Sequence, residues 1–574
     1  MAEHVKIGSV DELRARGWLT GKAGSLPICV FESDGELFAL DDRCPHMGFP
    51  VHRGTVESGL LTCHWHNARF DLRSGGTLDP WADDVRAYPV EVDDGTVTVV
   101  VAADHTDRVE YLRRRLEEGL EQGITLVIAK AVLGLLDAGV AVGDIVRIGT
   151  AFGTRYREAG WGAGLTVLTA MANVVPDLDP EDRGLALVHG LAFVSRDTRG
   201  RPPRFPLLAL GGALPTERLA TWYRRFIETR SADAAERTLA TAIAERDDTV
   251  AEAMFGAATD HVLLDGGHTV DFTNKAFEVL DHLGPQATAE VLPTLVAQTA
   301  SASRSEEQGS WCYPHDLTAL ISAASSDLPD RMARGARKRD FAGPAVLAWA
   351  ILSEDPHEVV TSIDDAIDDG ASLEELGRAV AYAAALRMAR FHTQNDHADW
   401  DEVHHAFTYA NALHQAIVRT GSPELARGVY HGALRVYLDR FLNIPAARVP
   451  SGPVAGPGDL AELAACWDQE GRVDDAGAIV YRHLVGGGDP ARVVAALGHA
   501  LLTEDAEFHW FQTFEAAVRQ FHAWPPGSEE GALILVGAAR FLAAHTPTRR
   551  ELSQVVRIAT RLRRGEALFE DADG

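Results

Sequence analysis

The chain has 574 residues, 46% of them hydrophobic and 24% charged, which is enough for two or more globular domains. Its 83 acidic residues outnumber its 54 lysines and arginines, and the net charge of −29 argues against binding to nucleic acid or to an anionic membrane surface. We expect a cytoplasmic protein that is neither secreted nor membrane-spanning, because the five cysteines are scattered, the N-terminus lacks a leader pattern, and charged residues interrupt the most apolar run, 125–147.

Residues 1–102 have the pattern of a small β domain. Short apolar or alternating runs at 28–31, 36–40 and 97–100 are separated by the turn pairs Asp34-Gly35 and Asp94-Gly95. We therefore predict an antiparallel, all-β N-terminal domain at residues 1–102.

Two short motifs in this domain place thiols beside imidazoles. Cys44-Pro45-His46 is followed, after sixteen residues, by Cys63-His64-Trp65-His66. Two thiolates on one iron and two neutral imidazoles on the other are the ligands of a Rieske [2Fe-2S] centre. A Cys2His2 zinc site uses the same ligand types, so the ligands alone leave both centres open.

The sequence around these motifs resembles the Rieske ferredoxin family. The resemblance covers residues 5–101 and includes both ligand pairs, their separation and the sequence ARFD at 68–71. It implies a [2Fe-2S] cluster held by Cys44, His46, Cys63 and His66. His64 is the alternative to His66 as a ligand, and the family's spacing favours His66.

The resemblance also implies a low reduction potential. High-potential respiratory members of the family have a disulfide between the two loops and hydroxyl groups that donate to the cluster, whereas the matching positions here are Phe49, His64, Ala68 and Phe70. Fewer donors stabilise the reduced cluster less. Such clusters resemble those that supply electrons to oxygenases.

From residue 108 almost to the end, Ala, Leu, Glu and Arg recur at helical spacing. We predict a junction at 104–107, an α-helical domain at 108–447 and a terminal α-helical unit at 461–574. Pro/Gly-rich breaks are expected at 198–206 and 448–460. The predicted fold class is thus a multidomain protein, with an all-β Rieske domain followed by a large all-α region.

A weak internal similarity suggests that the helical region contains duplicated units. His268 and Asn274 have the same spacing as His405 and Asn411, and His509 lies at the corresponding place in a more degenerate copy. The repeat is a hypothesis, because few positions agree.

The same positions give a candidate second iron site. Asp265-x-x-His268 and Glu402-x-x-His405 have the spacing of acid–histidine pairs in di-iron helical bundles, and His509 is a further candidate ligand. Pairs of this spacing also arise by chance in a chain this rich in both residue types. Core histidines without a metal, or a metal-free substrate pocket, are the alternatives.

Since a cluster of this kind stores one electron and does no bond chemistry, the function depends on what receives the electron. We expect an oxidoreductase that passes electrons from an external NAD(P)H-dependent reductase or ferredoxin to a catalytic centre in the helical region. The expected reaction is a non-haem iron oxygenase reaction on a small-molecule substrate. The alternative is an electron-transfer ferredoxin whose helical region docks a separate oxygenase, and a third reading is a redox sensor.

Overall fold

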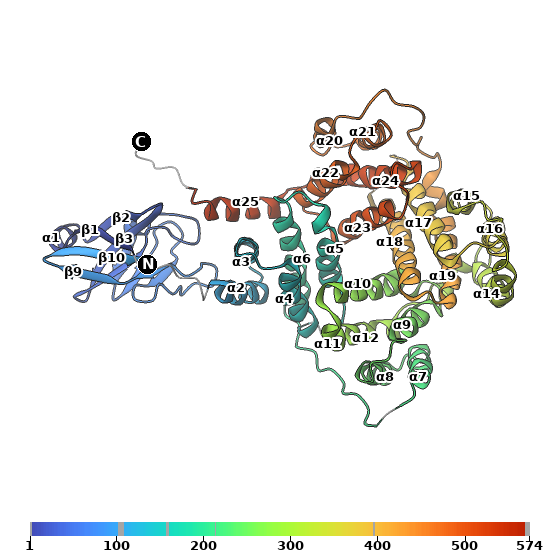
Figure 1. The fold of residues 1–574 in the computed structure, drawn as a ribbon, viewed down its shortest axis with the longest axis horizontal. Helices are drawn as coiled ribbons and strands as arrows, with labels where there is room; N and C mark the ends of the chain where they lie inside the picture. Colours follow the sequence, from blue (N-terminus) through green and yellow to red (C-terminus); the bar gives the residue numbers. More distant parts are fainter. Residues whose placement is uncertain are drawn as a thin grey trace. The chain divides into compact units, whose positions relative to one another are not determined.

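The structure is a computed structural model that describes residues 3–101, 108–156, 160–212, 214–393, 397–566 and 568. The chain forms two compact units (Figure 1). Unit 1 comprises Met1–Ala141 and Leu552–Gly574, and unit 2 comprises Val142–Glu551.

The β strands of unit 1 form three antiparallel sheets, in the orders β1-β10-β9, β2-β3-β4-β8 and β5-β6-β7. The strands are β1 (Glu3–Ser9), β2 (Trp18–Ala23), β3 (Leu26–Ser33), β4 (Glu36–Asp41), β5 (Thr55–Glu57), β6 (Leu60–Thr62), β7 (Arg69–Asp71), β8 (Ala87–Tyr88), β9 (Val90–Asp93) and β10 (Thr96–Val101). A short helix, α1 (Val10–Arg16), follows β1, and a 3-10 turn, η1 (Val51–Arg53), precedes β5.

The alternating sequence pattern decides which strand face is buried. In β10, Val97 and Val99 are fully buried, whereas the residues between and after them are partly exposed. They join a core with β1, β2 and β3, and a second core lies beneath the segments that contain Cys44 and Cys63. The predicted β domain is confirmed.

Three helices complete unit 1: α2 (Arg108–Gln122), α3 (Thr125–Asp137) and α25 (Glu551–Arg563). An ion pair between Asp137 and Arg563 links α3 to α25. The two compact units are divided at other residues than the predicted domains, whose boundaries at 108–447 and 461–574 stay a prediction. The predicted junction at 104–107 lies outside the described residues.

Unit 2 is helical, as predicted. Its α-helices are α4 (Val142–Arg155), α5 (Ala163–Val174), α6 (Arg183–Thr198), α7 (Thr216–Glu228), α8 (Ala232–Ala244), α9 (Val250–Thr259), α10 (His268–Leu283), α11 (Thr288–Val291), α12 (Val296–Ser301), α13 (Gly309–Cys312), α14 (Leu317–Gly335), α15 (Pro344–Ile351), α16 (Pro356–Asp368), α17 (Leu373–Ala389), α18 (His397–Thr420), α19 (Ala426–Leu438), α20 (Leu460–Cys466), α21 (Val473–Val485), α22 (Pro490–Thr503), α23 (Phe508–His522) and α24 (Glu529–His545). Both predicted breaks, 198–206 and 448–460, are confirmed, because α6 ends at Thr198 and the next α-helix after the second break, α20, begins only at Leu460.

Helices α10, α17, α18, α23 and α24 form the middle of unit 2 and pack against one another (Figure 1). α17 shows why: a capping box of Ser372 and Glu375 starts it, and every residue from Ala379 to Ala389 is buried, which requires neighbours on all sides. Among the described residues, no helix combines the length and apolar content needed to cross a membrane.

The α10–α23 contact holds a buried ion network. The Lys275 ammonium lies 2.8 Å from a Glu278 oxygen and 2.5 Å from a Glu515 oxygen, and all three side chains are almost fully buried. Although burial alone would raise the pKa of Glu278, the charge of Lys275 lowers it. Because unpaired buried charges are costly, this network fixes how α10 and α23 align.

Candidate functional site

Two loops of unit 1 carry the predicted cluster ligands, and the same backbone pattern closes both. In the first loop, Cys44 N–H donates to the Phe49 carbonyl and Gly48 N–H donates to the Cys44 carbonyl. In the second, Cys63 N–H donates to the Ala68 carbonyl and Asn67 N–H donates to the Cys63 carbonyl. The loops therefore present their cysteines in equivalent ways.

The fourth residue after each cysteine adopts the left-handed conformation. Gly48 has φ 84° and Asn67 has φ 61°. Only glycine takes this conformation freely, and asparagine tolerates it better than most other residues. Gly48 and Asn67 are therefore suited to these two positions of the loops.

The loops bring the four predicted ligands together. The thiols of Cys44 and Cys63 are buried within hydrogen-bonding reach, and the bond from Cys44 lowers the pKa of Cys63 to about 6. The rings of His46 and His66 are 4.8 Å apart, and His46 Nδ1 is buried without a hydrogen-bond partner. His64 instead contacts the Thr55 hydroxyl at 2.5 Å, so the geometry favours His66 over His64.

A family model for the Rieske [2Fe-2S] domain matches residues 3–89. The anthranilate 1,2-dioxygenase ferredoxin subunit of Burkholderia cepacia is 36% identical over 102 residues, which are 18% of this chain and 94% of the relative. The chain belongs to the Rieske [2Fe-2S] family. The match is confined to the N-terminal part, and no family model matches the rest of the chain.

Two further comparisons concern the same Rieske domain. The 4beta-methylsterol monooxygenase of Methylococcus capsulatus is 37% identical over 82 residues, which are 12% of this chain and 22% of that protein. The solved ferredoxin of carbazole 1,9a-dioxygenase from Nocardioides aromaticivorans is 25% identical, with coverage of 17% of this chain and 95% of that chain and a TM-score of 0.16.

The residues present fit the cluster that the Rieske family implies. The site offers two adjacent buried sulfurs and two imidazoles, one of which has a buried nitrogen with no other partner. The pKa of His46 is lowered to about 4, first by burial and then by the charge of Lys130. A neutral imidazole is the form that binds a metal.

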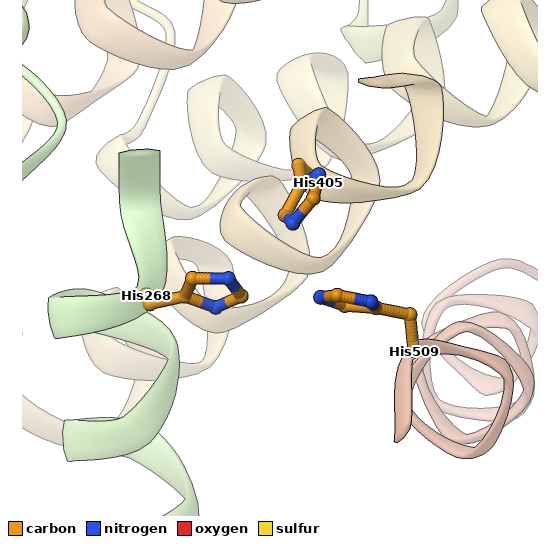
Figure 2. A group of neighbouring side chains, drawn as sticks. All are labelled: His268, His405 and His509. Carbon is orange, nitrogen blue, oxygen red and sulfur yellow. The ribbon is translucent and has the colours of Figure 1, made fainter. Parts of the chain in front are cut away.

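In unit 2, three of the other predicted ligands meet. His268 is the first residue of α10, His405 lies within α18, and His509 is the second residue of α23. Each offers one ring nitrogen, and these nitrogens lie within 4.8 Å of one another. Figure 2 shows the three rings pointing towards one another from three separate helices. We call His268, His405 and His509 the histidine triad.

Local chain geometry sets the position of His268. α10 begins at this residue because Asp265, Gly266 and Gly267 before it have positive φ angles of 51°, 66° and 111°. Two of these three residues are glycines, which adopt positive φ angles at little energetic cost. Because these angles are not those of a right-handed helix, no continuous helix runs through this stretch. The His268 ring therefore starts a helix and lies 5.0 Å from the ring of His405.

Two histidines of the triad, His405 and His509, are uncharged at neutral pH. Burial, and then the neighbouring histidines, lower the pKa of His405 to about 4 and that of His509 to about 2. Both imidazoles are thus neutral at pH 7, which leaves a lone pair free for a metal. His509 Nε2 is buried and has no hydrogen-bond partner.

Ring nitrogens of two triad histidines lie near oxygen atoms. His405 Nδ1 donates to the Asp401 carbonyl at 2.5 Å. His268 Nδ1 lies 3.8 Å from an oxygen of Asp271, a buried carboxylate that accepts a hydrogen bond from Gln512. Metal-binding histidines typically donate their second N–H to such an acceptor, which turns Nε2 towards the metal.

The two predicted carboxylates are not part of this group. Asp265 is exposed in the turn before α10, and its backbone N–H donates to the Ser303 carbonyl. Glu402 forms an ion pair with Arg435, although it is near enough to His405 to influence its pKa. Among the described residues, the group with converging ligand atoms contains only histidines.

Sequence reasoning missed two neighbours of the triad. Asp271 follows His268 by three residues, so a search for histidine before acid, as well as acid before histidine, would have found it. His404 is fully buried, its ring is 4.2 Å from that of His509, and neither of its nitrogens has a hydrogen-bond partner. No sequence signal separates it from its neighbour His405.

Proposed function

We propose that the chain is an oxidoreductase in which the Rieske cluster, held by Cys44, His46, Cys63 and His66, supplies single electrons to an iron bound by the histidine triad. The proposed reaction class is an oxygenase reaction on a small-molecule substrate, with NAD(P)H as the electron source through a separate reductase or ferredoxin. The iron, when bound, supplies dioxygen chemistry.

The observation that supports this proposal is the convergence of three imidazoles in unit 2. They come from three helices far apart in the sequence, and the central helix packing holds their backbones in place. With nitrogens at about 2.1 Å from a metal, three ligands lie about 3–4 Å apart, so the rings need only small rotations to bind one ion. Three protein ligands leave further coordination positions open, as catalytic metal sites require.

Iron suits this chain better than zinc. Zinc takes up no electrons, whereas the Rieske domain is a one-electron carrier in the same chain. The triad also lies beside aromatic rings, with Phe272 and Phe508 near His268. Such a surrounding limits the access of water to the bound metal.

The proposed location is the cytoplasm, where thiols stay reduced. All five cysteines are free of disulfides in the structure, including the buried Cys29 and Cys466, which lie outside the cluster loops.

The test is the ratio of iron to acid-labile sulfide in the full chain, purified without oxygen and loaded with ferrous iron. A [2Fe-2S] cluster alone gives one iron per sulfide, and the proposal predicts a ratio above one. Changing His268, His405 and His509 together to alanine is expected to return the ratio to one. The control is His431→Ala, which removes a buried histidine of α19 outside the triad and should keep the higher ratio.

One finding favours a second function, an electron-transfer ferredoxin whose helices dock a separate oxygenase. The Burkholderia cepacia relative is a ferredoxin subunit, and this chain covers 94% of it. The scaffold function predicts a ratio of one in the wild-type chain, so the same measurement separates the two.

A further inference from the structure

A lysine of the helical part of unit 1 contacts the first cluster-binding loop. Lys130 lies in α3, between apolar residues, and its side chain is only 11% exposed. Its ammonium donates to the Pro45 carbonyl at 2.5 Å and to the His46 carbonyl at 3.3 Å. A charged group in such a helix is rarely buried without a specific partner.

Asp83 holds this lysine from the other side. Its carboxylate lies 3.1 Å from the Lys130 ammonium and 3.0 Å from the Arg115 guanidinium of α2. Arg115 also donates to the carbonyls of Pro80 and Ala82. The ion pairs therefore join both helices to the segment that carries Trp81, whose ring is 4.7 Å from that of His46.

We propose that Lys130 is a positioning residue of the Rieske domain that raises the reduction potential of the cluster, and that Asp83 opposes it. Reduction adds one negative charge to the cluster, so a fixed cation at the ligand loop stabilises the reduced form and a fixed anion destabilises it. Because Lys130 and Asp83 are largely shielded from water, salt screens their charges little.

The carbonyl contacts give Lys130 a direct route to the cluster. Hydrogen bonds from an ammonium polarise the two peptide groups around His46 and draw electron density from the loop. They also hold the loop that Gly48 closes. A Cβ on Gly48 would lie 3.2 Å from Leu562 Cδ2 of α25, so helices of unit 1 pack closely against this loop.

A purely structural role makes a different prediction. If the ion pair only fastened α3 to the loop, breaking it from either side would disturb the cluster in the same way. If the charges act on the electron, removing the cation lowers the potential and removing the anion raises it. The sign of each shift therefore separates the two roles.

The experiment is a redox titration of the cluster in the full chain, followed by its visible absorption and its electron-spin signal. Lys130→Met is expected to lower the midpoint potential, Asp83→Asn to raise it, and Lys130→Arg to stay close to wild type. Lys22→Met, at an exposed position of β2, makes the same change in net charge and should leave the potential unchanged.

Two outcomes would overturn the proposal. One is a wild-type potential in Lys130→Met at full cluster content, and the other is a shift of both variants in the same direction. If Lys130→Met fails to assemble the cluster, the potential of Asp83→Asn alone tests the proposal. A midpoint potential of Asp83→Asn at or below that of the wild type would then refute the role of charge. None of these results depends on a metal in the histidine triad.

Discussion

Replacing Asp271 by asparagine is expected to weaken iron binding at the histidine triad by about 10- to 100-fold, or ~1.4–2.7 kcal/mol. The Asp271 oxygen lies 3.8 Å from His268 Nδ1, and the residue is only 2% exposed, so water screens its charge poorly. Asparagine keeps the volume and an oxygen that can accept from Gln512, and it removes only the charge. The loss should therefore come from a less basic His268 and not from a displaced helix.

The assay is a competition titration of the full chain with ferrous iron and a chelator under argon, with the cluster iron subtracted through the sulfide content. Asp182→Asn is the matched control, because Asp182 is equally buried but pairs with His499 of α22. Iron affinity within twofold of wild type in Asp271→Asn would refute the argument. A weakened affinity counts only if the melting temperature of the variant stays near that of the control.

Three further predictions follow from other parts of the structure. Cys63→Ser or His66→Ala should abolish the [2Fe-2S] absorption and electron-spin signal while helical circular dichroism stays largely intact, and a normal Rieske spectrum in either variant would contradict the ligand assignment. Lys275→Met should lower the free energy of unfolding by about 3–5 kcal/mol in urea, because it removes the buried cation between two buried carboxylates and leaves them only the partly exposed Arg519, and a loss below about 1 kcal/mol would show that they relax or take up protons. Burial lowers the pKa of His189 to about 4, below the value of about 6.5 in the unfolded chain. The contribution of neutral His189 to stability is therefore complete above pH 6.5 and falls as the pH drops towards 4, by ~2 kcal/mol at pH 5. If the free energy of unfolding of His189→Gln depends on pH as strongly as that of the wild type, this reasoning is wrong.

The Rieske domain could be predicted from sequence because its chemistry is local. Each ligand pair sits within four consecutive residues, and the strands around the pairs have an alternating pattern that identifies their buried face. Backbone hydrogen bonds within each loop, such as Gly48 N–H to Cys44, then fix the geometry without help from distant segments. The contact of Lys130 with the first cluster-binding loop could not be predicted, because it joins segments that are distant in the sequence. Lys130 lies in an apolar helix, and no spacing rule connects α3 with a loop more than eighty residues earlier.

Contacts between distant segments were still harder to predict in the helical region. Helical periodicity predicts that a helix buries one face, and it does not say which other helix covers that face. The repeat hypothesis selected His268, His405 and His509, and the structure brings these three together. Their places in the helices differ, however, because His268 and His509 lie in first turns and His405 lies in the third turn of α18. The duplicated units therefore stay a hypothesis, and the convergence of the three rings is independent evidence for a shared site.

What distinguishes the triad from the other buried histidines is convergence. His189 Nε2 donates to the Leu502 carbonyl and His483 Nδ1 donates to the Gly458 carbonyl, as expected for histidines that serve packing. Single nitrogens without partners occur elsewhere in unit 2 as well, for example in His414. Three rings from separate helices that each offer a nitrogen within 4.8 Å of the others are the arrangement that a shared ligand requires. An ion at that point would satisfy all three lone pairs at once, and an electron carrier in the same chain makes a redox-active ion the one that this arrangement can use.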